Sequence, residues 1–286
     1  MKFGIVGNTT KPIIKEYIPP LMKWLTHRSH EYVLESSLID YLEIKNKSTR
    51  HVAIHELGTK CEMVLAFGGD GTMLSTARAV GRTGVPILGV NLGGLGFLAE
   101  VSVDELHPTL EKIFEHHYAL MDRMVLRAVH EKHEGHNHVL ALNDVVIDKG
   151  SYSRLMELQM FINDEYLTTY HADGVIVASP TGSTAYSLSA YGPILTPDVQ
   201  ALIINPICPH SLGARPMVIP ADSTITVVPK LHEKEAFLSA DGQIEDNVVS
   251  EEAIVIQRAD FTVRWVQPEG SNFYEVLREK LNWGGR

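Results

Sequence analysis

The chain has 286 residues, enough for one large domain or two ordinary ones, and 44% of them are hydrophobic, so it can bury extensive cores. A formal net charge of −10 at pH 7 argues against broad binding to nucleic acid or to a membrane surface, because both attract basic faces. With two cysteines and no run near the ~20 apolar residues of a membrane span, the composition predicts a cytoplasmic protein whose partners are small molecules.

The first part of the chain alternates short apolar runs with helical patterns. An apolar run over residues 2–6, followed by a Gly-Asn turn, predicts a strand. Apolar residues at helical spacing over residues 14–25 predict a helix, which the Pro19-Pro20 pair is expected to interrupt or restart. A second strand is predicted over Tyr32–Leu34.

Two longer apolar runs, Met63–Phe67 and Pro86–Val90, are typical of strands buried on both faces of a sheet. A helical pattern separates them, so the segment predicts a β-α-β unit and a parallel sheet. The first run leads into the sequence Gly-Gly-Asp-Gly-Thr over residues 68–72, and the second leads into the glycine-rich Asn91–Phe97. Because the carboxyl ends of neighbouring strands form the ligand crevice of an open α/β sheet, we expect both loops to face one site.

The loop over residues 68–72 has the composition of a phosphate site. Its three glycines leave no β-carbons between the backbone and a visiting anion, and the start of the following helix offers unpaired N–H groups. Asp70 is an anion within such a loop, which indicates a separate role such as accepting a proton or holding a cation. The alternative is that Asp70 caps the helix and the glycines only form a turn.

A helix is predicted over Val103–Leu120, and from about Arg123 the pattern changes to short alternating runs between turn residues, which predict a β-rich second domain. These runs are Val125–Val129, Val139–Ile147, Leu155–Ile162, Gly174–Ala178, Ala201–Ile204, Thr224–Val228, Ala253–Arg258 and Thr262–Val266. Near the end, Phe273–Leu281 has helical spacing and predicts a helix that packs back onto the first domain. We therefore expect an α/β domain of residues 1–122 with 270–286, and a β-rich domain of residues 123–269.

A second polar cluster follows Asp173-Gly174 and covers Ser179–Ser189, which is rich in hydroxyl side chains. Hydroxyls beside glycine suit a ligand with many polar atoms, such as a nucleotide ribose or phosphate, and Tyr186 adds a ring that can stack on a base. A solvent-exposed loop or a helix cap is the alternative. The hydrolase pattern Gly-x-Ser-x-Gly does not occur around Ser183.

Four histidines, His130, His133, His136 and His138, lie in one polar stretch. Their spacing is compatible with zinc, but we expect a solvated hairpin tip without a metal.

Taken together, the motifs resemble those of the NAD kinase family. The strings that carry the resemblance are Gly68–Thr72, Asn91–Phe97, Asn143-Asp144, His171–Asp173, Thr181–Ser189, Arg215-Pro216 and Asp241-Gly242-Gln243. The first is shared with phosphofructokinases and diacylglycerol kinases, whereas the Thr181–Ser189 string is more specific. The resemblance implies a Rossmann-like α/β N-terminal domain with a parallel sheet, of the phosphofructokinase and diacylglycerol kinase superfold, and a β-rich NAD-binding C-terminal domain.

The same resemblance implies an activity: phosphorylation of the 2′-hydroxyl of the adenosine ribose of NAD to give NADP. The donor would be ATP or polyphosphate, with a divalent cation, expected to be Mg²⁺, bound with ATP, and the protein would be a homodimer or homotetramer. A lipid or sugar kinase of the same superfold and a non-catalytic nucleotide-binding regulator remain the alternatives. A lipid kinase should expose an apolar entrance and a sugar-phosphate kinase should gather arginines; a regulator would not require Asp70.

By matching positions, the resemblance makes Asp70 the catalytic base and places donor phosphates on Gly68, Gly69, Gly71 and Thr72. The implied NAD-binding residues are Asp70, Gly71, Asn143, Asp144, Arg154, His171, Asp173, Thr184, Ala185, Tyr186, Ser187, Leu188, Ser189 and Gln243. The family usually has Asn-Glu where this chain has Asn143-Asp144. Asp is shorter by one methylene, so its carboxylate extends less far toward the ribose hydroxyls.

Overall fold

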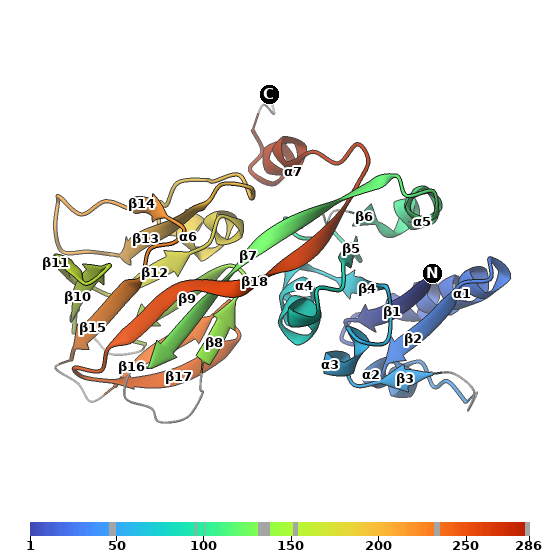
Figure 1. Cartoon of the computed structure of the whole chain (residues 1–286), viewed down its shortest axis with the longest axis horizontal. Helices are drawn as coiled ribbons and strands as arrows, with labels where there is room; N and C mark the ends of the chain where they lie inside the picture. Colours follow the sequence, from blue (N-terminus) through green and yellow to red (C-terminus); the bar gives the residue numbers. More distant parts are fainter. Residues whose placement is uncertain are drawn as a thin grey trace. The chain divides into compact units, whose positions relative to one another are not determined.

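The computed structural model describes residues 1–45, 50–94, 96–99, 101–130, 138–150, 154–231 and 235–283. The chain forms two compact units, the first of Met1–Asp122 with Thr262–Arg286 and the second of Arg123–Phe261. It passes between the units within two long strands, β7 (Tyr118–His130) and β18 (Ile254–Pro268) (Figure 1). No helix in the described part of the chain is both long enough and apolar enough to cross a membrane.

The first unit is built on a parallel sheet, as predicted. Its strands, besides β18, are β1 (Lys2–Gly7), β2 (Glu31–Glu35), β3 (His51–Val52), β4 (Met63–Gly68), β5 (Ile87–Asn91) and β6 (Val101–Ser102). The order is β18-β5-β4-β1-β2-β3, with β6 also paired to β5. Every residue of β4 and β5 is buried, which is why their sequences read as continuous apolar runs.

Helices cover both faces of this sheet. The helices of this unit are α1 (Ile14–His27), α2 (Ser36–Tyr41), α3 (Ile54–Leu57), α4 (Asp70–Val80), α5 (Leu106–Phe114) and, near the end of the chain, α7 (Phe273–Lys280), with single 3₁₀ turns at Gly81–Thr83 and Val103–Glu105. One face of the sheet packs with α1 and α5 in a single core cluster. On the other face, Leu57 of α3 lies against Gly4, and Met73 of α4 lies against Gly89. This arrangement leaves the carboxyl ends of the strands free for loops.

Two helix predictions are wrong in their extent. Helix α1 runs unbroken through Pro19 and Pro20, although each removes one hydrogen bond. The helix buries four apolar side chains on one face, each worth about 1.5–3 kcal/mol, and this burial offsets the cost of the prolines. The helix predicted over Val103–Leu120 ends at Phe114, because His116 takes a left-handed φ of 61° and the His117 N–H bonds back to the Lys112 carbonyl at 2.8 Å.

The second unit is β-rich, as predicted, and packs two sheets face to face. Its further strands are β8 (His138–Ala141), β9 (Asp144–Asp148), β10 (Met156–Ile162), β11 (Glu165–Ala172), β12 (Gly174–Ala178), β13 (Ala201–Ile207), β14 (Met217–Pro220), β15 (Ile225–Lys230), β16 (Glu235–Ala240) and β17 (Ile244–Val249). One sheet is antiparallel, in the order β14-β13-β12-β9-β16-β17. The strands β11-β10-β15-β18, with β7 and β8, form the other.

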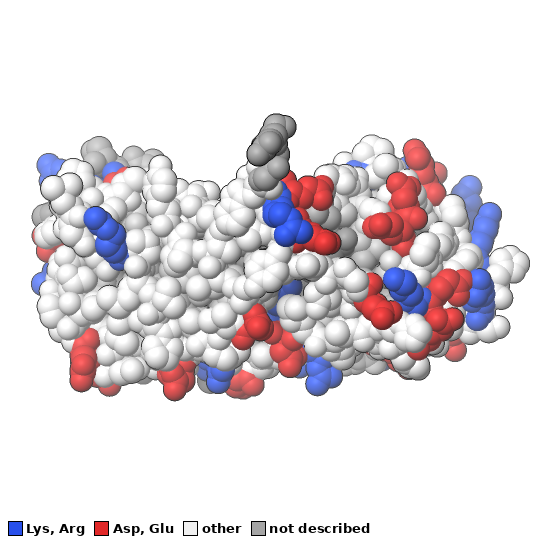
Figure 2. All heavy atoms as spheres, turned by 90° about the horizontal axis from the view of Figure 1, so that it is seen from above, with Lys and Arg blue, Asp and Glu red and all other residues white. Residues whose placement is uncertain are grey.

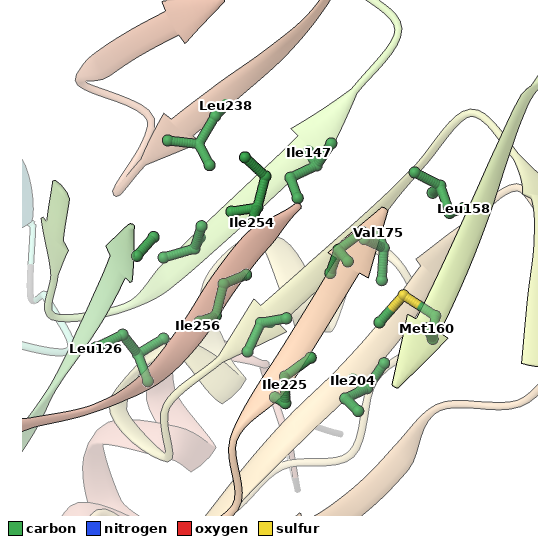
Figure 3. Packing of buried hydrophobic residues seen from close by; sticks show 14 of the residues in the cluster. Leu126, Ile147, Leu158, Met160, Val175, Ile204, Ile225, Leu238, Ile254 and Ile256 are labelled. Atoms are coloured by element: carbon green, nitrogen blue, oxygen red, sulfur yellow. The ribbon is translucent and has the colours of Figure 1, made fainter. Parts of the chain in front are cut away.

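Alternate residues of both sheets fill the core of the second unit. Figure 3 shows Ile147, Val175 and Ile204 of the antiparallel sheet beside residues of the facing strands, such as Met160 and Ile225. The opposite face of the antiparallel sheet carries a smaller apolar cluster that includes Val146 and Ile176. This second face also receives the segment that follows β12, because Ala190 and Leu195 pack against the cluster.

The charged side chains on the face drawn in Figure 2 are interspersed. Lys and Arg atoms lie scattered among Asp and Glu atoms there, and large areas carry neither.

Candidate functional site

In the first unit the two glycine-rich loops meet at Asp70. Helix α4 begins at Asp70. The N-cap position is Gly69, so no side chain caps the helix. The Asp70 carboxylate instead accepts hydrogen bonds from the backbone N–H groups of Phe97 and Leu98, each at 3.1 Å. Asp70 therefore does not cap its own helix. Its carboxylate is held by the loop that follows the neighbouring strand, β5.

The second loop reaches Asp70 because Asn91 and Gly96 shape it. The Asn91 side chain accepts from the Gly93 N–H at 2.9 Å and donates to the Gly94 carbonyl at 2.6 Å, which turns the chain at the end of β5. Gly96 lies against the carboxylate so closely that a β-carbon there would overlap Asp70 Oδ1. A side chain at this position would therefore displace Asp70.

A hollow of about 520 Å³ lies beside the start of α4. Its lining includes Asn8, Lys11, Glu35, Gly69, Gly71 and Thr72. Gly69 faces open space, since no atom lies within 4 Å of where its β-carbon would be. The backbone of the glycine loop is therefore accessible to a ligand in the hollow, and a helix start of this kind favours anions.

Sequence reasoning missed Lys11. Its Nζ lies 3.6 Å from the position that a β-carbon of Gly93 would occupy, so the ammonium reaches the second glycine-rich loop. Within the described part of the chain Lys11 makes no ion pair, which leaves its charge available to a ligand. The sequence did contain a signal for Lys11. The polar turn after β1 follows the carboxyl end of a strand that pairs with β4, and ligands of open α/β sheets bind at the carboxyl ends of the strands.

In the second unit, Asn143 and Asp144 lie at the junction between the end of β8 and the start of β9. The sequence predicted a single strand over this stretch, Val139–Ile147. The segment after β12 holds them from one side. The Ser179 N–H donates to the Asn143 carbonyl at 2.8 Å, and Ser179 Oγ donates to the Leu142 carbonyl at 2.5 Å. Gly182 packs on the Asn143 backbone so tightly that a β-carbon would overlap it. The structure thus brings the predicted Asn-Asp pair and the hydroxyl-rich segment together.

Asp241 holds the same pair from the other side. Its carboxylate accepts from the N–H groups of Leu142 at 3.1 Å and Asn143 at 2.7 Å, and its own N–H donates to the Asp144 carbonyl at 3.0 Å. Asp241 had no predicted role, although it belongs to the Asp241-Gly242-Gln243 string that is similar to the family.

The hydroxyl-rich segment forms a 3₁₀ turn (Thr181–Thr184) and α6 (Tyr186–Ser189). Ser183 and Ser187 are fully buried. Ser183 Oγ bonds with backbone groups of Pro180 and Leu195, and the side chain of Asn205 donates to the Ser187 carbonyl at 3.0 Å. These two serines therefore brace the segment. Tyr186 is 46% exposed, which leaves its ring accessible.

Carboxylates gather around Tyr186 and Asp144. Asp144 is only 3% exposed, and burial raises the pKa of its carboxyl to about 7, assisted by the negative charge of Asp241 and opposed by the Tyr186 N–H. Burial also raises the pKa of the Tyr186 hydroxyl, with smaller contributions from Asp148, Cys208, Asp144 and Asp173. Asp148 was not predicted, although its spacing from Asp144 puts both on one face of β9.

The remaining predicted residues lie at more exposed positions. Asp173 forms an ion pair with Lys149 at 2.7 Å. His171 is exposed near the end of β11, and Arg154 is exposed just before β10. Gln243 is exposed in the turn between β16 and β17.

The prediction of a solvated histidine tip is wrong for His130. This residue is 2% exposed, and its Nδ1 lies 3.1 Å from Glu252 Oε1. His133 and His136 lie outside the described residues. In the part of the chain that the structure describes, no three or more His, Cys, Asp or Glu side chains are grouped to hold a metal ion.

Comparisons with known proteins cover both units. Residues 3–118 match the family model of the ATP-NAD kinase N-terminal domain, and residues 142–268 match that of the ATP-NAD kinase C-terminal domain. The chain is 42% identical over 288 residues to an NAD kinase of Geotalea daltonii, covering 100% of this chain and 99% of the relative. It is 40% identical over 284 residues to an NAD kinase of Moorella thermoacetica, covering 99% of this chain and 90% of the relative.

Two solved structures are similar in fold. The crystal structure of yeast NADH kinase complexed with NADH superposes with a TM-score of 0.91 at 26% identity, covering 100% of this chain and 89% of the other. An NAD kinase from Archaeoglobus fulgidus in complex with ATP gives a TM-score of 0.76 at 24% identity, covering 99% of each chain, and supports the fold alone.

Proposed function

We propose that this chain, which belongs to the NAD kinase family and phosphorylates NAD with ATP, uses Asp70 as the base that accepts the proton of the ribose 2′-hydroxyl. The observation that carries the proposal is the position of the Asp70 carboxylate, where both glycine-rich loops meet. Two backbone N–H groups fix its orientation and leave it further lone pairs for a hydroxyl proton. As the ribose oxygen attacks the γ-phosphorus, its proton passes to Asp70, and the products are NADP and ADP.

The donor phosphates bind, on this proposal, to the backbone of Gly68, Gly69 and Gly71 and to Thr72. The open space at Gly69 and the start of α4 support this role. Lys11 adds a positive charge on the side of the second loop. Phosphoryl transfer needs positioning and charge neutralisation more than covalent help from the protein, and these groups supply the positioning and part of the neutralisation.

The NAD adenosine binds, on the same proposal, to the second unit. Asn143 and Asp144 contact the ribose, and Tyr186 stacks on the base with Thr184, Ala185, Leu188 and Ser189 around it. Ser187 contributes by bracing α6, because its side chain is buried. The exposed positions of Arg154, His171, Asp173 and Gln243 fit contacts to other parts of the dinucleotide.

A divalent cation, which we expect to be Mg²⁺, enters with ATP. Mg²⁺ usually keeps several waters and is held by one or two carboxylates together with substrate phosphates, and the lining of the donor hollow includes the carboxylate residue Glu35. Bound there, it would neutralise phosphate charge. We further propose that the protein works in the cytoplasm as a homodimer or homotetramer, as the family resemblance implies.

One incubation tests the donor, the acceptor and the position of the transferred phosphate. Purified protein with NAD, ATP and Mg²⁺ should form a product that an NADP-specific dehydrogenase reduces, and phosphorus NMR should place the new phosphate on the 2′ position. Parallel incubations with polyphosphate, and with a sugar or a diacylglycerol as acceptor, separate the alternatives. Phosphate on another hydroxyl, or faster transfer to the sugar or the lipid, would contradict the proposal.

A further inference from the structure

We infer that Asp241 is a positioning residue that holds Asn143 and Asp144 in the conformation in which they bind the NAD ribose. This inference rests on the proposed role of that pair. Asp241 itself is not placed against the substrate, and it acts through the backbone of its neighbours.

The contacts of Asp241 converge on one short segment. Besides the bonds from Leu142 and Asn143, its Oδ1 lies 3.4 Å from the Asp144 nitrogen, so three consecutive N–H groups face one carboxylate. The Asp241 N–H returns a bond to the Asp144 carbonyl at 3.0 Å. Bonds to an ionised acceptor are roughly twice as strong as neutral ones, and these fix both ends of the predicted Asn-Asp pair.

The segment needs such an acceptor because it lies at a break between strands. β8 ends at Ala141 and β9 begins at Asp144, so Leu142 and Asn143 fall outside both ladders. Leu142 is buried, and a buried N–H without a partner costs free energy comparable to a lost hydrogen bond. Asp241 supplies the partner, and the turn between β16 and β17 thereby sets the backbone that carries Asn143 and Asp144.

The position of Asp241 is itself specified. Its φ of 54° lies in the left-handed region, which Asp tolerates better than most residues because its short side chain can bond locally. The next residue, Gly242, also has a left-handed φ of 61°. Two successive left-handed residues form a tight hairpin turn, and this turn directs the Asp241 carboxylate toward the Asn143 backbone.

The charge of Asp241 also acts on Asp144. The groups that face the Asp144 carboxyl are Asp241 from the β16–β17 turn and the Tyr186 N–H from α6. Burial and the Asp241 charge both raise the pKa of Asp144. Removing the charge should therefore lower the pH at which Asp144 ionises, and the pH dependence of NAD binding reports that shift because Asp144 belongs to the proposed ribose site.

The test compares NAD binding by calorimetry across pH 5.5 to 8.5 for the parent chain and Asp241→Asn. In the parent, NAD affinity should rise with pH through about 7 as Asp144 ionises and accepts more strongly from ribose hydroxyls. In Asp241→Asn we expect affinity to fall by about 10- to 100-fold, the cost of one or two hydrogen bonds to a charged acceptor. The midpoint of the pH dependence should move to lower pH, and KM for ATP should stay within about twofold.

Asp164→Asn is the matched control, because Asp164 also takes a left-handed φ, 66°, in a hairpin turn of the second unit and is exposed. It should behave as the parent does. If Asp241→Asn does not fold, Asp241→Gly replaces it, since glycine adopts the left-handed conformation without strain. Parental NAD affinity with an unmoved pH midpoint in the folded variant would overturn the inference. A parent chain that forms no NADP would overturn the proposed function instead.

Discussion

Lys11 offers the donor a positive charge in a hollow whose other polar lining includes Glu35 and backbone amides. In Lys11→Met, KM for ATP should rise by about 10- to 100-fold, because a hydrogen bond to a charged group is worth ~1.5–3 kcal/mol. NAD affinity should change little. Steady-state kinetics with ATP varied at saturating NAD measures this. Lys23→Met, at an exposed position of α1, is the control, and equal KM values for both variants would contradict the assignment.

Asp144 is predicted to reduce stability as the pH rises. Its pKa is about 7 in the folded chain against an ordinary value of 3.8 for an exposed aspartate, so the folded state binds more protons than the unfolded state between these values. The free energy of unfolding therefore falls as pH rises from about 4 to about 7. Asp144→Asn removes this penalty. Urea denaturation should therefore show that the free energy of unfolding of the variant, relative to that of the parent, is higher at pH 8 than at pH 4. A constant difference at both pH values would contradict the assigned pKa shift.

The residues differ in how far the sequence could identify them. Asp70 stands in a dense glycine motif, so its loop was recognisable from local composition alone. Lys11 and Asp241 act through contacts with residues that lie far away in sequence, respectively the loop after β5 and the loop before β9. A single sequence does not contain those distances. His130 was misread for the same reason, because its partner Glu252 is 122 residues away.

At the scale of elements, the loop that follows β5 should control Asp70. In Gly96→Ala the new β-carbon overlaps Asp70 Oδ1, so the carboxylate must move and kcat should fall by at least tenfold. Gly94→Ala is the matched control within the same loop, since nothing lies within 4 Å of its β-carbon position. Comparing kcat and thermal stability of the two variants checks the prediction. Equal kcat values would show that the loop does not fix Asp70.

The elements that were predicted well are those whose signal is local. β4 and β5 are buried on both faces, so their apolar runs are continuous, and the helix between them is short and regular. β11, β14, β16 and β17 were not predicted. β11, for example, buries only Tyr170 and Ala172, so its pattern lacks a clear alternation. The runs predicted at Ala253–Arg258 and Thr262–Val266 are one strand, β18, which runs without a break from Ile254 to Pro268.

At the scale of the whole molecule, we predict a homo-oligomer. The motivation is the family resemblance, together with a β-rich unit whose sheet edges need cover. Light scattering at micromolar concentrations should give a mass near two or four times 31.8 kDa. A mass near 31.8 kDa across that range would contradict the prediction.

The central claim is that Asp70 accepts the proton of the ribose hydroxyl, and Asp70→Asn tests it most directly. The variant keeps the size of the side chain and one acceptor oxygen for the loop, but it has no carboxylate to take a proton. Turnover should fall by roughly 10² to 10⁴ while NAD and ATP affinities change little, and raised Mg²⁺ should not restore it. Near-parental kcat would contradict the claim, and recovery of the lost rate by Mg²⁺ would show that Asp70 holds the metal of the donor instead.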